Sequence, residues 1–135
     1  MTLELTYLAL TAVLAASLWI PFIVGLGRVT PAEAVPGNFV RPPEPSSLPP
    51  WVHRAFRAHL NLIEQFVPFA ALVVIAHLGG ISNGWTVGAV VAFFWLRVAH
   101  AVVMITAVGA YPARPIIFTA AWVAILVLGW QVLAA

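Results

Sequence analysis

The chain has 135 residues, of which 63% are hydrophobic and 7% are Asp, Glu, Lys or Arg. A water-soluble domain usually has about 25% charged residues, so a chain with this few cannot cover a water-facing surface and must lie mostly in lipid. A formal net charge of +2 is too small to indicate nucleic-acid binding, and the absence of cysteine excludes disulfide, thiolate and iron–sulfur chemistry on the protein.

The first predicted element is a membrane-spanning helix over about 5–27, a stretch without a charged residue. A spanning helix needs about 20 apolar residues. We expect it to be retained rather than cleaved as a signal peptide, because the run is long and Glu4 stands where a positive charge would be needed. The connection that follows, about 28–56, is rich in proline, so we expect an extended and stiff polar loop.

Three further apolar stretches predict spanning helices over about 57–78, 85–108 and 115–134, with a Gly-rich turn over 79–84. A closed β-barrel would also satisfy the backbone in lipid, but its strands alternate apolar and polar residues, and these stretches do not. We therefore predict an all-α fold, an integral membrane four-helix bundle that occupies residues 1–135 as one domain.

The distribution of arginine predicts the orientation of the bundle. Arg28, Arg41 and Arg54 lie in the first connection and Arg114 in the third, whereas the termini and the 79–84 turn carry no Lys or Arg. The positive-inside rule then places the first and third connections in the cytoplasm and both termini on the opposite side.

A polar stripe follows one face of the second predicted helix. The residues within a sector of roughly 100° are Arg54, Arg57, Asn61, Glu64, Gln65 and Pro68. A carboxylate at the depth of Glu64 would cost several kcal/mol if it faced lipid, so it must face protein, a cation or a water-filled cavity. A Glu64–Arg pair that only joins helices is one interpretation. Pro68 has no N–H, so the carbonyl of Glu64 is left free on the same side.

The third predicted helix places Arg97, His100 and Met104 on one face. Arg97 lies near the middle of the span, so we expect it to meet Glu64 or another acceptor and to shape a cavity rather than to contact a ligand. His100 is either a packed core residue or part of the same site.

Arg114 immediately precedes Pro115, at the predicted start of the last helix. A helix N-terminus attracts anions, so Arg114 either helps to bind one or only marks the cytoplasmic side. Together these residues predict a cytoplasm-facing pocket for a small anionic molecule that also carries an amine. The bilayer could supply a hydrophobic second substrate, and we expect no metal.

Two motifs resemble those of the MAPEG family, the membrane-associated proteins in eicosanoid and glutathione metabolism. The run Arg57-Ala58-His59-Leu60-Asn61-Leu62-Ile63-Glu64, followed by Pro68-Phe69, resembles the family signature, and Arg97-Val98-Ala99-His100 is similar to its second motif. The resemblance covers essentially the whole chain and is to bacterial-type members like the microsomal glutathione transferases.

The resemblance implies a homotrimer that binds glutathione between subunits at the cytoplasmic side. It implies glutathione contacts from Arg28, Arg57, Asn61, Glu64 and His100. Arg114 resembles, with a one-residue shift in the loop, the family arginine near the thiol, and would be the catalytic residue. Many members have Tyr where this chain has Met104, and some have Arg at the position of Leu60.

Three functions are compatible with these features. The first is a membrane-bound glutathione-dependent transferase or peroxidase that acts on hydrophobic electrophiles or lipid hydroperoxides, with an Arg-stabilised glutathione thiolate as nucleophile. The second, suggested by Met104 and Leu60, is a non-enzymatic MAPEG-fold protein that binds a lipid or a small anionic molecule. The third is a proton-coupled exporter that uses Glu64, although the first predicted span of this chain carries no acid. Specific leukotriene or prostaglandin synthesis is not supported.

Overall fold

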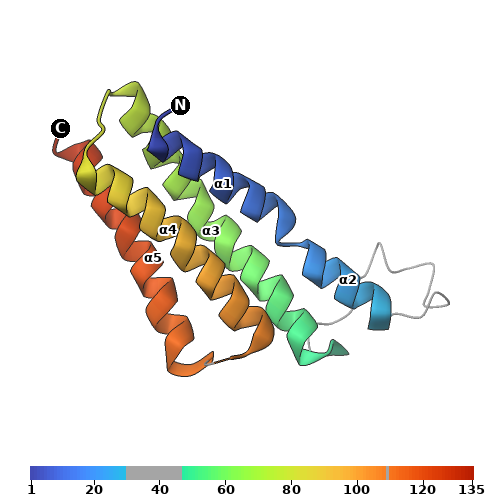
Figure 1. The fold of residues 1–135 in the computed structure, drawn as a ribbon. Helices are drawn as coiled ribbons and strands as arrows, with labels where there is room; N and C mark the ends of the chain where they lie inside the picture. The colour runs from blue at the N-terminus through green and yellow to red at the C-terminus, as the bar shows by residue number, and fades with distance from the viewer. Residues whose placement is uncertain (30–46, 109) are drawn as a thin grey trace.

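Helices account for nearly all of the residues that the computed structural model describes, which are 1–29, 47–108 and 110–135. In chain order they are α1 (Leu3–Ser17), α2 (Ile20–Val29), α3 (Pro50–Leu78), α4 (Gly84–Thr106) and α5 (Ala110–Leu133), as Figure 1 shows. Four stretches are long and apolar enough to cross a membrane, namely Leu3–Arg28, Pro50–Leu78, Gly84–Thr106 and Tyr111–Leu133. The all-α prediction with four spans is therefore confirmed. Most of the predicted stiff loop, including Arg41, lies outside the described residues.

The first span is two helices rather than the single predicted one. α1 ends at Ser17 and α2 begins at Ile20. Pro21 explains the break, because it has no N–H to donate and its ring clashes with the carbonyl four residues earlier, which belongs to Ser17. The break lets α2 follow the start of α3, where the rings of Phe22 and Phe56 lie 4.9 Å apart between centroids.

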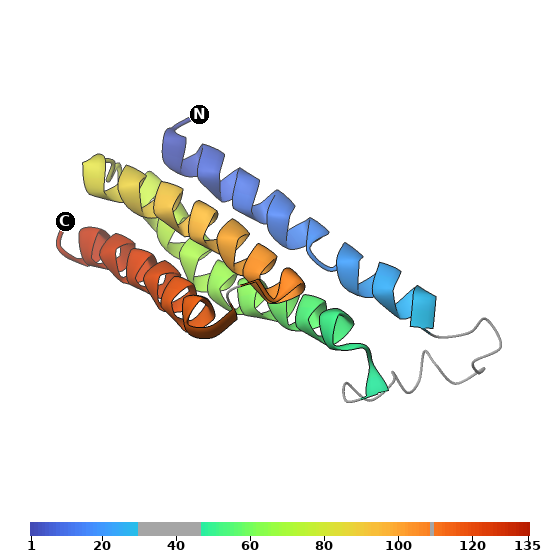
Figure 2. The same cartoon turned by 60° about the horizontal axis from the view of Figure 1, so that its bottom comes forward.

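α3 begins seven residues earlier than predicted, at Pro50 instead of about 57. We had assigned this segment to the proline-rich connection, but proline is also favoured at the first position of a helix, which is where Pro50 stands. At 29 residues the helix is about 43 Å long, longer than the roughly 30 Å of a bilayer core. Figures 1 and 2 show that α2 and the start of α3 project beyond the α4–α5 end of the bundle.

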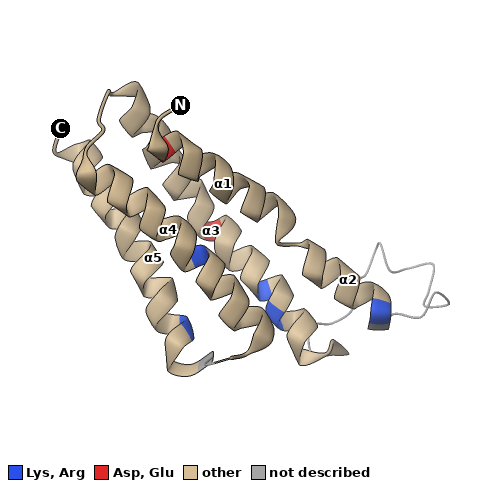
Figure 3. Cartoon of the chain, in the orientation of Figure 1, with Lys and Arg blue, Asp and Glu red and all other residues tan. Residues whose placement is uncertain are grey.

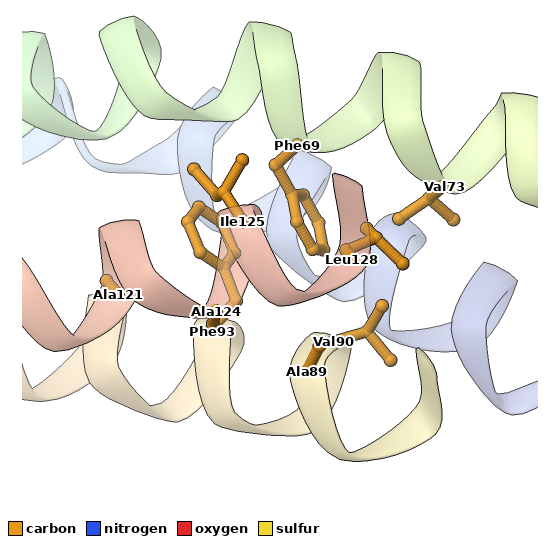
Figure 4. Close-up of a cluster of buried hydrophobic side chains, with 9 residues drawn as sticks. All are labelled: Phe69, Val73, Ala89, Val90, Phe93, Ala121, Ala124, Ile125 and Leu128. Atoms are coloured by element: carbon orange, nitrogen blue, oxygen red, sulfur yellow. The ribbon is translucent and has the colours of Figure 1, made fainter. Parts of the chain in front are cut away.

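Two packed clusters hold the helices together. The larger joins α3, α4 and α5 and contains Phe69, Val73, Ala89, Val90, Phe93, Ala121, Ala124, Ile125 and Leu128 (Figure 4). At its centre the rings of Phe69 and Phe93 are stacked with centroids 4.0 Å apart. The smaller joins α1, α3 and α4 through Ala15, Leu18, Ala58, Leu62, Ala101 and Met104. Small residues at these contacts let the backbones approach closely, which is how helices associate in lipid.

Hydrogen bonds around Glu4 join the helices at the end of the bundle that carries both termini (Figure 1). Glu4 is 5% exposed, and its Oε1 accepts hydrogen bonds from the hydroxyls of Ser82 and Thr86, each at 2.8 Å. Asn83 caps the N-terminus of α4 and its side-chain amide donates to Gln131 of α5 at 2.9 Å. The sequence analysis assigned no partner to Glu4. The candidate site lies towards the other end.

Candidate functional site

A cavity of about 710 Å³ opens between α3 and α5, with α4 behind it. It is lined by Arg57, Asn61 and Glu64 of α3, His100 of α4, and Tyr111, Arg114, Pro115, Phe118 and Thr119 of α5. Five residues that the sequence analysis selected, from three separate helices, thus surround one space. Figure 3 marks the charged positions on these helices.

The spacing on α3 explains how its three side chains reach the cavity together. Arg57, Asn61 and Glu64 are four and three residues apart, so they share one face of the helix. Asn61 is 6% exposed and His100 is 1% exposed, whereas Arg57 and Glu64 are exposed. The amide and the imidazole therefore form the floor, and the two charged groups lie towards the opening.

The connection between α4 and α5 places Tyr111 and Arg114. α4 ends at Thr106 and is followed by its C-cap Ala107, which has the left-handed backbone conformation with φ 61°. Tyr111 then has an extended backbone, with φ −131° and ψ 128°, before the regular part of α5. Arg114 follows within the next turn and lines the cavity together with the α3 residues.

Arg54 lies on the predicted polar stripe but does not line the cavity. Its Nε donates to the carbonyl oxygen of Met104 at 2.9 Å, and another of its nitrogens donates to that of Ile105 at 3.3 Å. These are carbonyls of the last turn of α4, which have no partner within the helix. Arg54 therefore ties the end of α4 to α3, just before the connection that carries Tyr111.

Arg97 meets Gln65 rather than Glu64. Its side chain is 1% exposed, and one terminal nitrogen donates to the Oε1 of Gln65 at 3.1 Å. Its guanidinium carbon lies 5.6 Å from the centre of the Phe118 ring. No arginine among the described residues comes within the 4.0 Å of an ion pair with Glu64. Within the described residues of the single chain, Glu64 is therefore exposed and forms no ion pair with an arginine, and a Glu64–Arg pair that joins helices stays a prediction.

Besides Arg54 and Arg97, three more of the selected residues lie outside the cavity lining. Arg28 is exposed at the end of α2, Pro68 is exposed one turn of α3 beyond Glu64, and Gln65 is buried against Arg97. α3 continues through Pro68, which cannot donate to the carbonyl of Glu64.

Helical spacing placed Met104 on the same face as His100, but the structure places Tyr111, and not Met104, in the cavity lining. Met104 is 4% exposed within the smaller packed cluster and does not line the cavity. Tyr111 does line it. The sequence analysis did not select Tyr111, because its spacing from His100 does not place the two on one helix face, but such spacing has no meaning across a break in the helix. Pro112 gave the missing signal, since a residue before proline favours extended backbone.

The lining combines groups for an anion, an amine and an apolar body. Arg57 and Arg114 can hold carboxylates or a thiolate, and Glu64 can hold an ammonium group. Asn61 and the hydroxyls of Tyr111 and Thr119 add hydrogen bonds, and Pro115 and Phe118 supply apolar surface. Within the described residues, no group of three His, Cys, Asp or Glu side chains could hold a metal ion.

Comparison with known proteins identifies the family. The family model of the MAPEG family matches residues 6–134 of the chain, and a comparison with curated proteins found no match. The family match includes α1 from Thr6 onward, all of α2 to α5, and every residue of the cavity lining. The chain therefore belongs to the MAPEG family.

Proposed function

We propose that the protein is a membrane-bound glutathione transferase or peroxidase that acts on hydrophobic electrophiles or lipid hydroperoxides. One observation carries this proposal. In a chain of the MAPEG family, charged and polar side chains from the first motif (Arg57, Asn61 and Glu64), the second motif (His100) and the start of α5 surround a single cavity of about 710 Å³. Its mixture of two arginines, one glutamate and an amide matches the two carboxylates, the ammonium and the peptide groups of glutathione.

Each lining residue has a role in this proposal. Arg57 binds a carboxylate of glutathione, with bidentate geometry where the carboxylate allows it. Glu64 binds the ammonium group, and Asn61 and His100 contribute hydrogen bonds from the floor. Arg114 stabilises the sulfur as thiolate, which is the nucleophilic form of a thiol.

The same thiolate serves two reactions. With an electrophile, sulfur forms a bond to carbon while the leaving group departs with the bonding electrons. With a lipid hydroperoxide, sulfur attacks the terminal oxygen and the O–O bond breaks, which gives an alcohol after protonation and a sulfenic acid of glutathione. A second glutathione then reduces the sulfenic acid to form glutathione disulfide and water. The protein needs no nucleophile of its own, which fits a chain without cysteine.

We further propose a homotrimer in which a neighbouring copy covers the cavity and supplies Arg28. Support comes from Glu64, which is exposed in the single chain although it lies inside a membrane-spanning helix. A carboxylate facing lipid there is costly, so a second copy must shield it or keep the cavity filled with water. Arg28 lies at the end of α2, on the part of the chain that projects beyond the α4–α5 end (Figure 3). In this proposal the cavity faces the cytoplasm and both termini the opposite side.

Met104 favours the second candidate function, a non-enzymatic membrane protein that binds a lipid or a small anion. Position 104 is filled by a buried thioether in the packed cluster, so no phenol from α4 reaches the cavity. This candidate shares the binding site but predicts no turnover. The two candidates are separated by measuring binding and conjugation on the same preparation.

The test uses the full chain purified in detergent. We expect it to bind glutathione and to conjugate it to 1-chloro-2,4-dinitrobenzene. Arg114→Ala should lower kcat/KM about 100-fold, within the range seen when one charge-stabilising group is removed from an active site. Arg114→Lys should keep part of the rate, and His77→Gln, at the other end of α3, should keep all of it. Glutathione binding without turnover would support the second candidate, and absence of glutathione binding would contradict the proposed transferase or peroxidase.

A further inference from the structure

Arg97 is a buried cation beside the cavity that the proposed reaction does not use. Its side chain is 1% exposed, and a guanidinium group stays protonated in proteins. One terminal nitrogen donates to the neutral Oε1 of Gln65 at 3.1 Å, whereas Nε has no hydrogen-bond partner. A full positive charge thus lies inside a membrane-spanning helix with a neutral amide as its hydrogen-bond acceptor.

No acid in the described part of the chain forms an ion pair with Arg97, although the Glu64 carboxylate attracts the guanidinium from a greater distance. Glu4 accepts the hydroxyls of Ser82 and Thr86 at the other end of the bundle. Glu64 is exposed on the cavity lining and lies beyond the 4.0 Å of an ion pair with Arg97. Unpaired charge is costly in a bilayer, so an anion held close to Arg97 would be strongly favoured.

Arg97 lies directly behind the cavity floor. The Phe118 ring, which lines the cavity, is 5.6 Å from the guanidinium carbon of Arg97 and 5.6 Å from the His100 ring. The Phe118 ring is therefore an apolar layer that borders both the guanidinium and the cavity. Charges interact strongly across such an apolar layer because little water screens them.

The charges around the cavity do not balance. Arg57, Arg114 and Arg97 oppose the single carboxylate of Glu64, which leaves two uncompensated positive charges. Glutathione with a protonated thiol carries one net negative charge, and the thiolate form carries two. The cavity and its floor are therefore complementary in charge to the thiolate form.

We propose, on the basis of the function proposed above, that Arg97 is a positioning residue for charge. From behind Phe118 and His100, it makes the cavity select ligands with a second negative charge at the sulfur. It does so without touching the ligand. Gln65 holds it in place, since its amide oxygen is the acceptor for the guanidinium.

The test compares two unreactive analogues in binding titrations on the detergent-solubilised full chain. S-methylglutathione is neutral at sulfur, and glutathione sulfonate has a permanent negative charge there. The wild type should prefer the sulfonate. Gln65→Glu places a carboxylate against Arg97 without removing it, and should reduce this preference about tenfold while S-methylglutathione binds nearly as before.

Two further variants complete the test. Arg97→Met should reduce the preference as Gln65→Glu does, and Gln65→Glu covers the case in which the methionine variant does not fold. Gln131→Glu is the matched control, because it adds the same charge at the other end of the bundle, where Gln131 accepts from Asn83. It should leave the preference unchanged.

The outcomes separate this inference from the proposed function. If Gln65→Glu leaves the preference unchanged, or weakens both analogues equally, Arg97 only stabilises the fold and the inference is wrong while the proposed function stands. If neither analogue binds the wild type, the proposed function is wrong and the inference with it.

Discussion

Three arginines that look alike in the sequence have three different environments. Arg57 is exposed on the cavity lining, Arg54 donates to the last carbonyls of α4, and Arg97 is buried against Gln65. All three were expected on polar faces of spanning helices. Because the same side chain can line a cavity, tie two helices or lie buried against an amide according to its surroundings, residue type alone does not assign its role.

Tyr111 gives a testable prediction about a single residue. Its hydroxyl reaches the cavity from the extended segment before α5, where it can donate to the sulfur or a carboxylate of glutathione. One hydrogen bond contributes about 1 kcal/mol net, so Tyr111→Phe should raise the KM for glutathione about fivefold with a small change in kcat.

Tyr7→Phe is the matched control for this measurement. Tyr7 is the other tyrosine of the chain, and it lies on α1, where its ring contacts Phe94. An equal KM in wild type and Tyr111→Phe would show that the hydroxyl does not contact glutathione.

Among the elements, the junction between α4 and α5 decides the shape of the site. α4 ends at Thr106 and is followed by its left-handed C-cap Ala107, and Tyr111 keeps the chain extended before the regular part of α5. Arg54 of α3 donates two hydrogen bonds to carbonyl oxygens in the last turn of α4. The wall formed by α5 is therefore placed by a contact outside the cavity.

Arg54→Met tests this placement. The loss of two hydrogen bonds from a charged group should lower the free energy of unfolding by about 2 kcal/mol, and turnover should fall because Arg114 is no longer aligned with α3. Arg54→Lys should restore part of the stability. Circular-dichroism melting and the conjugation assay measure the two effects, and an unchanged melt with unchanged turnover would contradict the assigned role.

Across the whole molecule, the two ends of the bundle differ in their polar side chains. One end holds the cavity, and the other is joined by Glu4, the 79–84 turn and the contact between Asn83 and Gln131. The stacked rings of Phe69 and Phe93 lie in the packed cluster between them. Damage to the Glu4 end should therefore affect stability more than binding.

Glu4 provides the corresponding prediction. Glu4→Ala leaves the hydroxyls of Ser82 and Thr86 without their acceptor and should cost about 2 kcal/mol of unfolding free energy. Glu4→Gln should cost less, because its amide oxygen can still accept. Glutathione affinity, measured by calorimetry on the folded fraction, should be equal in all three proteins. A selective loss of affinity would show that the ends are coupled.

Three properties followed from the amino-acid sequence by itself. They are that the chain lies mostly in lipid, how many spans it has, and which face of α3 has the polar side chains. These are local properties. A long apolar stretch without charged residues indicates a span wherever it occurs, and helical periodicity places Arg57, Asn61 and Glu64 on one side of the helix. Motif spacing also indicated the family correctly, and the match over residues 6–134 confirms it.

Only the tertiary structure decided which helices close the cavity and what each polar residue contacts. It placed Gln65 rather than Glu64 on Arg97, brought Tyr111 into the lining and left Met104 in the packed cluster. The physical reason is that these contacts join α3 to α4 and α5. The crossing of those helices depends on how Phe69, Phe93 and their neighbours pack, which no local pattern encodes.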